Sequence, residues 1–227
     1  MTKIICLVGT NSDHSTNRTL LQYIQKHFQE DAEIELAEIK EFPLFNKPED
    51  KQVPDCVQEV AAKIEAADGL IIGAPEYDHS VTAALSNALH WLSYGITPLV
   101  GKPIMITGAS YGILGSSRAQ QHLRQILDSP DIRGFVMPNS EFLLSHSLQA
   151  FDEEGNLTNN ETIEKLEDIF YDFLDFITIS KQLKRSHKRN KKEAADFEWD
   201  DEGQDQAIET AIQDQEEQAQ EAAKHAE

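Results

Sequence analysis

Hydroxyl and amide side chains gather in residues 9–18, directly before a stretch whose apolar residues have helical spacing. Backbone N–H groups at the start of a helix, together with its dipole, form a binding site for an anion. Thr10, Ser15 and Asn17 can add neutral hydrogen-bond donors. Capping of the helix by Ser15 or Thr16 is the alternative explanation of these residues. The segment matches neither the P-loop nor Gly-x-Gly-x-x-Gly, which argues against ATP and Rossmann-type dinucleotide sites.

A second polar segment, PEYDHSV at residues 75–81, follows a buried apolar run. Mostly polar residues with one aromatic ring among them suit a planar heterocycle, because backbone groups can bond its edge while Tyr77 lines a face. Glu76 can equally be a solvated or helix-capping acid. His79 and His90 have no second ligand at metal spacing, so we expect surface or packing histidines and no metal site.

A third segment, residues 107–118, contains three glycines, two of which are Gly108 and Gly112. Glycine lets the backbone approach a ligand closely. The alternative is a glycine-rich turn into a helix that Ser116 caps. Arg118 would lie early in that helix, where a cation is mildly unfavourable for the dipole, so we expect an anionic partner beside it.

Predicted strands and helices alternate along residues 1–180 and position these loops. We predict strands at residues 3–8, 33–39, 69–74 and 104–107, with 135–137 and 142–144 sharing a broken fifth strand. We predict helices at residues 16–29, 54–67, 83–92, 116–127 and 162–177. This alternation predicts a three-layer, flavodoxin-like α/β fold with a five-stranded parallel sheet in the order 2-1-3-4-5. Ligands bind beyond the carboxyl ends of such strands, so the three loops should form one site.

Charge and apolar content exclude several classes of protein. The 227 residues include 20 basic and 40 acidic ones, and the formal charge of −20 argues against nucleic acid or an anionic membrane as partner. No apolar run approaches the roughly 18 to 20 residues of a membrane span. The two cysteines lie outside any Cys-x-x-Cys or Cys/His cluster, so neither metal nor dithiol chemistry is predicted. We therefore expect a cytoplasmic protein.

The distribution of charge divides the chain near residue 180. Residues 1–180 carry 12 basic and 27 acidic groups, residues 181–192 carry seven basic and no acidic ones, and residues 193–227 carry one lysine and 13 acids. The last stretch has few large aliphatic residues to bury, so residues 181–227 are predicted to be a disordered or partly helical tail. Alternatively, the basic stretch extends the last helix and pairs with an acidic surface of this chain or of a neighbouring subunit.

Several of these segments, in this order, resemble the flavodoxin-like NAD(P)H-dependent FMN reductases. The resemblance covers roughly residues 1–180, and PEYDHS is its most specific part. It rests on residues 9–18, PEYDHS at 75–80 with NALHWL at 87–92, GASYG at 108–112 with RAQ at 118–120, and FDEEGNL at 151–157. The family implies FMN as cofactor and NAD(P)H as co-substrate.

The resemblance also implies which residues bind FMN. They are Thr10, Ser15, Thr16, Asn17, Pro75, Glu76, Tyr77, Asp78, Gly108, Ser110 and Gly112. The first loop would hold the phosphate, and residues 75–78 would lie against the isoalloxazine. Asp13 departs from the family pattern, because many members carry a basic residue in this loop. Backbone N–H groups and His14 would then hold the phosphate. Asp78 stands where the family usually has asparagine, which would alter a hydrogen bond to the flavin edge.

The implied reaction is ping-pong: NAD(P)H passes a hydride to flavin N5 and leaves, and an acceptor takes its place. The acceptor is a quinone, an azo compound, a metal oxyanion or free flavin, and no catalytic side chain is needed. One alternative is a flavin-binding electron carrier or regulatory subunit. Another is an interaction protein that has lost FMN, which Asp13 favours. The family further implies a homodimer or homotetramer, and the apolar helix at residues 85–92 favours such contacts. Trp91 is expected to be a core or a subunit-interface residue.

Overall fold

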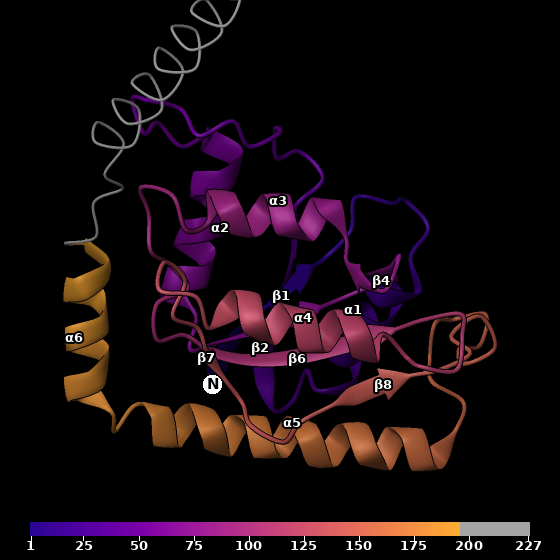
Figure 1. Cartoon of the computed structure of the whole chain (residues 1–227). Coiled ribbons are helices and arrows are strands. Elements are labelled where there is room, and N and C mark those ends of the chain that lie inside the picture. The colour runs from indigo at the N-terminus through magenta and orange to yellow at the C-terminus, as the bar shows by residue number, and fades with distance from the viewer. Residues whose placement is uncertain (196–227) are drawn as a thin grey trace, which may run out of the picture. The chain divides into compact units, whose positions relative to one another are not determined.

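A parallel sheet forms the centre of the structure, a computed structural model that describes residues 1–195 (Figure 1). Its strands follow the order β2-β1-β3-β6-β7, and β8 pairs with β6. Their bounds are β1 Thr2–Val8, β2 Ala32–Glu38, β3 Gly69–Gly73, β6 Pro103–Ala109, β7 Phe135–Val136 and β8 Phe142–Leu144. With β7 and β8 as two parts of the fifth strand, this is the predicted order, and the flavodoxin-like α/β fold is confirmed.

The fifth strand is broken because its two parts pair with different ends of β6. Phe135 lies opposite Pro103 at the start of β6, and Phe142 lies opposite Thr107 near its end. Between the two parts, Pro138 has no N–H to give to the sheet. Asn139 follows it with a φ of 55°, so the chain turns out of the strand there.

Helices cover both faces of the sheet and bury two separate apolar cores. Alternate residues of β1 belong to different cores: Ile5 and Leu7 to one, Ile4 and Cys6 to the other, all 0% exposed. The first core is shared with α2 Asp55–Ala66, α3 Ala83–Trp91 and α4 Ser117–Leu127, and the second with α1 Thr16–His27 and α5 Asn160–Ser180. Burial on both faces explains why β1 reads as a continuous apolar run.

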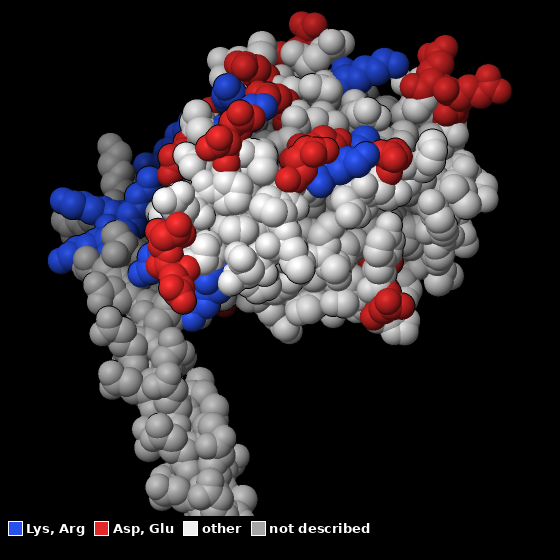
Figure 2. Space-filling view, turned by 90° about the horizontal axis from the view of Figure 1, so that it is seen from above, with Lys and Arg blue, Asp and Glu red and all other residues white. Residues whose placement is uncertain are grey.

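The apolar side of helix α3 packs against other parts of the same chain. Leu85, Leu89 and Trp91 are buried in the first core, and Trp91 Nε1 donates to the Pro43 carbonyl oxygen at 2.8 Å. Of the two roles expected for Trp91, the structure therefore shows the core one, and the buried leucines of α3 are not available for subunit contacts. Association of subunits stays a prediction. Helix α3 nevertheless has no Asp, Glu, Lys or Arg, and Figure 2 shows a wide area without charged side chains in the middle of the face that it draws.

The basic stretch folds as a separate helix, α6 (Lys184–Ala195), after α5 ends at Ser180. It belongs to one compact unit with the sheet, which extends from residue 1 to residue 194. Ion pairs fasten this part of the chain: Lys181 Nζ lies 2.7 Å from Asp68 Oδ1, and Arg133 pairs with Glu193. Lys and Arg side chains gather at the left of Figure 2, the side on which Figure 1 shows α6.

The predicted acidic stretch from residue 196 onward lies outside the described residues. Among residues 1–195, no helix has both the length and the apolar character that crossing a membrane requires.

Candidate functional site

A pocket of about 310 Å³ lies at the carboxyl ends of β1, β3 and β6, where the three predicted loops meet. In Figure 1 this is the end of the sheet near the labels β4 and β8. Its walls are formed by His14, Ser15, Thr16, Asn17, Pro75, Glu76, Tyr77, Ala109, Ser110, Tyr111 and Gly112. Tyr77 and Tyr111 are 54% and 60% exposed, so aromatic rings border an opening to solvent.

The first wall of the pocket is the start of α1. Ser15 caps this helix by accepting a hydrogen bond from the Arg18 N–H, at 3.4 Å. Thr16 Oγ1 bonds Ser147 Oγ at 2.8 Å. The buried Asn17 side chain donates to the Ala109 carbonyl at 2.8 Å and accepts from its N–H at 2.9 Å. The N–H groups of the first two residues of α1, Thr16 and Asn17, have no partner within the helix, so they remain available to an anion.

Charged side chains beside this wall are paired with one another. Lys40 forms an ion pair with Asp13, and its hydrogen bond lowers the pKa of the Asp13 carboxyl. Arg18 binds the Glu38 carboxylate through two nitrogens, at 2.7 and 2.9 Å. The same guanidinium donates to the carbonyl oxygens of Ser12 and Asp13, at 2.6 and 3.1 Å. Arg18 therefore holds the loop backbone in place.

The second wall is a short hairpin that the sequence pattern did not reveal. Strands β4 (Glu76–Tyr77) and β5 (Ser80–Val81) pair antiparallel. Asp78 and His79 form the two-residue turn with φ of 50° and 62°, as a type I′ turn requires. The turn carries Asp78 away from the residues that line the pocket, and the preference of such turns for Asp or Asn accounts for the residue type.

Glu76 points from this hairpin to the start of α4. Its Oε2 accepts from the N–H groups of Arg118 and Ala119, at 2.9 and 3.3 Å, and its Oε1 lies 3.5 Å from the Arg118 guanidinium. Ser116, the cap of this helix in the alternative explanation of the third segment, makes no side-chain capping bond and has a φ of 74°. The anionic partner expected beside Arg118 is Glu76 itself.

The third wall is the glycine-rich loop after β6, which packs against the loop after β8. Ser110 N–H donates to the Leu144 carbonyl at 3.0 Å, and His146 N–H donates to the Gly112 carbonyl at 3.1 Å. An added Cβ at Gly112 would meet only Ser110 Oγ, 3.9 Å away, so this backbone faces open space.

The structure brings eight of the eleven predicted site residues into the pocket wall and leaves three outside it. Thr10 is buried and braces the first loop by accepting from the Ser12 N–H at 3.1 Å. Gly108 serves packing instead, because a Cβ there would lie 1.8 Å from Ser116 Oγ and 2.7 Å from the Ala74 carbonyl oxygen. Asp78 lies in the turn described above.

Three residues of the wall lie outside the eleven listed FMN positions: His14, Ala109 and Tyr111. His14 was expected beside the phosphate because of Asp13, and the structure places it in the wall, whereas Ala109 and Tyr111 were not expected there. Tyr111 lies between two glycines of the third loop, where an exposed aromatic ring has little structural reason to be. The residue type of Ala109 did not indicate a place in the pocket wall, because its backbone and not its side chain determines that place.

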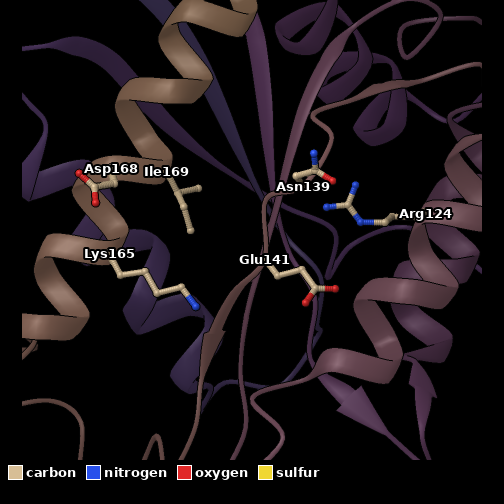
Figure 3. A pocket seen from close by; sticks show the side chains of 6 residues that line it. All are labelled: Arg124, Asn139, Glu141, Lys165, Asp168 and Ile169. Carbon is tan, nitrogen blue, oxygen red and sulfur yellow. The ribbon is translucent and has the colours of Figure 1, made fainter.

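A second hollow, shown in Figure 3, lies between α4, α5 and the segment that joins β7 to β8. Its charges are mixed: Arg124 and Lys165 against Glu141 and Asp168. The Arg124 guanidinium is already bonded to the carbonyl oxygens of Met137 and Ser140, at 3.0 and 2.5 Å. Burial lowers the pKa of this group. Arg124 thus holds the broken strand together, and we assign no ligand to this hollow.

Comparison with known proteins adds to this geometry. The sequence profile of a family described as NADPH-dependent FMN reductase matches residues 2–149. The chain is 50% identical over 179 residues to the NADH:(hydroxy)cinnamate reductase subunit CrdA of Vibrio ruber, covering 79% of this chain and 89% of that protein. It is 41% identical to the NADH-dependent flavin reductase subunit 2 of Lactobacillus johnsonii, covering 77% and 97%. The flavoenzyme NAD(P)H:(acceptor) oxidoreductase FerB of Paracoccus denitrificans superposes with a TM-score of 0.70 at 26% identity, covering 79% and 99%.

Proposed function

Because the chain belongs to the NADPH-dependent FMN reductase family, an oxidoreductase family that uses FMN with NAD(P)H, we propose that its pocket supports a two-stage hydride transfer. In this ping-pong scheme NAD(P)H and the acceptor visit the same open face in turn. The acceptor would be a quinone, an azo compound, a metal oxyanion or free flavin. FMN supplies the hydride chemistry when bound, and the protein supplies binding, orientation and electrostatics.

The residues of the pocket fit FMN in three respects. The open space at Gly112 leaves room for a planar ring to approach the backbone without meeting a side chain. The unpaired N–H groups at the start of α1 suit a phosphate, because they add the helix dipole to hydrogen bonding. The two half-exposed tyrosines at the rim offer aromatic faces beside the opening.

We assign roles to the wall residues accordingly. Ser15 and Thr16, with the backbone N–H of Asn17, would hold the phosphate. The Asn17 side chain contributes indirectly, because its amide is bonded to Ala109 and fixes α1 against β6. On the opposite wall, Pro75, Glu76 and Tyr77 would lie against the isoalloxazine, and Ser110 and Gly112 would meet its edge. The proposed FMN-binding residues are therefore Ser15, Thr16, Asn17, Pro75, Glu76, Tyr77, Ser110 and Gly112.

The observation that carries the proposal is the meeting of three separate loops around one pocket in a chain of this family. An absorbance titration of the purified protein with FMN, followed by anaerobic NADH or NADPH, tests it. We expect saturable binding and then bleaching of the flavin band. Binding without bleaching would favour an electron carrier, and no binding would contradict the proposal.

A second candidate function is that of an electron-delivering subunit. It is favoured because two similar proteins, those of Vibrio ruber and Lactobacillus johnsonii, are named as subunits. Steady-state oxidation of NAD(P)H with an added quinone separates the candidates. Turnover by the chain alone supports the reductase, whereas turnover that appears only with a second protein supports the subunit.

A homodimer or homotetramer also remains our proposal, as does a cytoplasmic location. The uncharged area in Figure 2 and the exposed Tyr77, Tyr111, Ile113 and Leu148 around the pocket support association. Sedimentation of the full chain tests it, and a monomer at all concentrations would contradict it.

A further inference from the structure

The phosphate end of the pocket lies in an acidic protein. Residues 1–180 have 27 acids against 12 basic residues. Among the side chains that line the pocket, His14 is the one basic residue and Glu76 is the one acid. Glu76 is bonded to the start of α4, at the other wall. A bound phosphate would therefore meet one basic side chain in this wall.

The other cations near this wall are already paired. Lys40 binds Asp13, and Arg18 binds Glu38 and the carbonyl oxygens of the first loop. These pairs have a further effect, because the carboxylate of Asp13 would otherwise lie unpaired one residue from His14. Pairing with Lys40 cancels most of the repulsion that this carboxylate would exert on a phosphate.

We propose that His14 supplies the side-chain N–H that binds the FMN phosphate, and that Lys40 acts as a positioning residue by holding Asp13 in an ion pair. The inference rests on the proposed function, since it concerns how the same pocket tells FMN from a flavin without phosphate. It also removes the reason for supposing that Asp13 abolishes FMN binding. A histidine ring can donate one hydrogen bond when neutral and two when protonated.

Riboflavin provides the matched ligand, because it has the same ring system and lacks the phosphate. Quenching of flavin fluorescence gives the affinity of each ligand for the wild type, His14→Gln and His14→Lys. We expect His14→Gln to weaken FMN binding about tenfold, the size of one charge-assisted hydrogen bond, and to leave riboflavin unchanged. His14→Lys should keep or increase the preference for FMN. His90→Gln, at an exposed histidine outside the pocket wall, is the control and should change neither affinity.

The role of Lys40 is tested by a double-mutant cycle with Asp13. Lys40→Gln should weaken FMN binding several-fold, because it leaves the Asp13 carboxylate unpaired near the phosphate. The double variant Asp13→Asn/Lys40→Gln should return FMN affinity close to that of the wild type. If the double variant binds FMN as poorly as Lys40→Gln alone, the positioning role is overturned.

Different results would overturn the proposed function and the role of His14. If the wild type binds neither FMN nor riboflavin, the proposed function itself is wrong. If it binds both flavins and His14→Gln leaves the ratio of the two affinities unchanged, the function stands and the role of His14 is overturned. A loss of FMN and riboflavin affinity by the same factor in His14→Gln would also overturn it, because that pattern indicates a damaged pocket.

Discussion

Glu76 shows how one side chain can serve the pocket and the fold together. Its carboxylate is only 10% exposed and accepts from two backbone N–H groups at the start of α4. The usual cap residue of this helix, Ser116, is held in the left-handed region and gives no such bond. An acid from another element therefore caps the helix and fixes the hairpin to it.

We predict that Glu76→Gln lowers the free energy of unfolding by about 1 kcal/mol, because it removes the charge that complements the helix dipole and Arg118. Urea unfolding without flavin measures this and avoids any contribution from binding. Glu153→Gln, at an exposed acid of the loop after β8, is the matched control. Equal stability of Glu76→Gln and the control would contradict the capping role.

At the scale of elements, Asn17 joins α1 to β6. Its amide bonds both the N–H and the carbonyl of Ala109, and the side chain is buried. Residues 92 positions apart in the chain thus meet at the pocket. The start of α1, where we propose that the phosphate binds, is placed against the glycine-rich loop through this one side chain.

Asn17→Ala should cost about 2–4 kcal/mol of stability, because it leaves two buried backbone groups of Ala109 without partners. Thermal or urea unfolding measures the loss, with Asn11→Ala, at an exposed residue of the same loop, as control. A loss no greater than that of the control would show that water or a rearranged α1 satisfies Ala109.

Some elements of this fold can be predicted from the sequence and others cannot. The strand order followed from apolar periodicity, because β1 and β3 are buried on both faces and β2 alternates at the edge. The β4–β5 hairpin escaped prediction, because two-residue strands carry no period and its turn contains no glycine. At the pocket, residue types indicated the loops, but the pairing of Asp13 with Lys40 depends on tertiary placement that one sequence does not show.

At the scale of the whole molecule, Asp68 ties the end of the described chain to the sheet. It accepts from the Lys3 N–H at 2.9 Å and pairs with Lys181 Nζ at 2.7 Å. Burial by itself raises the pKa of Asp68, but the hydrogen bonds from Lys181 and Lys3 outweigh it and lower the pKa overall. A carboxyl whose pKa is lower in the folded state stabilises the fold above its ordinary pKa.

The lowered pKa of Asp68 determines how the effect of Asp68→Asn on the free energy of unfolding depends on pH. The variant should be less stable than the wild type at neutral pH, and the difference should shrink as the pH falls below about 4, because Asp68 then gains its proton in the unfolded chain before it does so in the folded one. Urea unfolding between about pH 7 and about pH 3 measures the difference. Asp172→Asn, at an exposed acid of α5, is the control. A difference that stays constant with pH would contradict the electrostatic role.

The boundary near residue 180 stays a prediction and can be tested by truncation. A chain of residues 1–180 should fold and bind FMN as tightly as the full chain, because the pocket wall is built from residues 14–112. Flavin titration measures the affinity, and sedimentation compares the oligomeric states. Loss of FMN binding by a truncated chain that still unfolds cooperatively would show that α6 or the residues after it contribute to the pocket.

Helix α6 lies beside the amino-terminal ends of β6 and β7, where Arg133 and Gly134 precede the strand, whereas the pocket opens at the carboxyl ends. Its exposed Lys188, Lys191 and Lys192 are primary amines on one short segment. Coupling the protein to a resin or an electrode through these amines would therefore leave the pocket opening turned towards the bulk solution. A protein immobilised in this way would keep its pocket accessible to dissolved molecules.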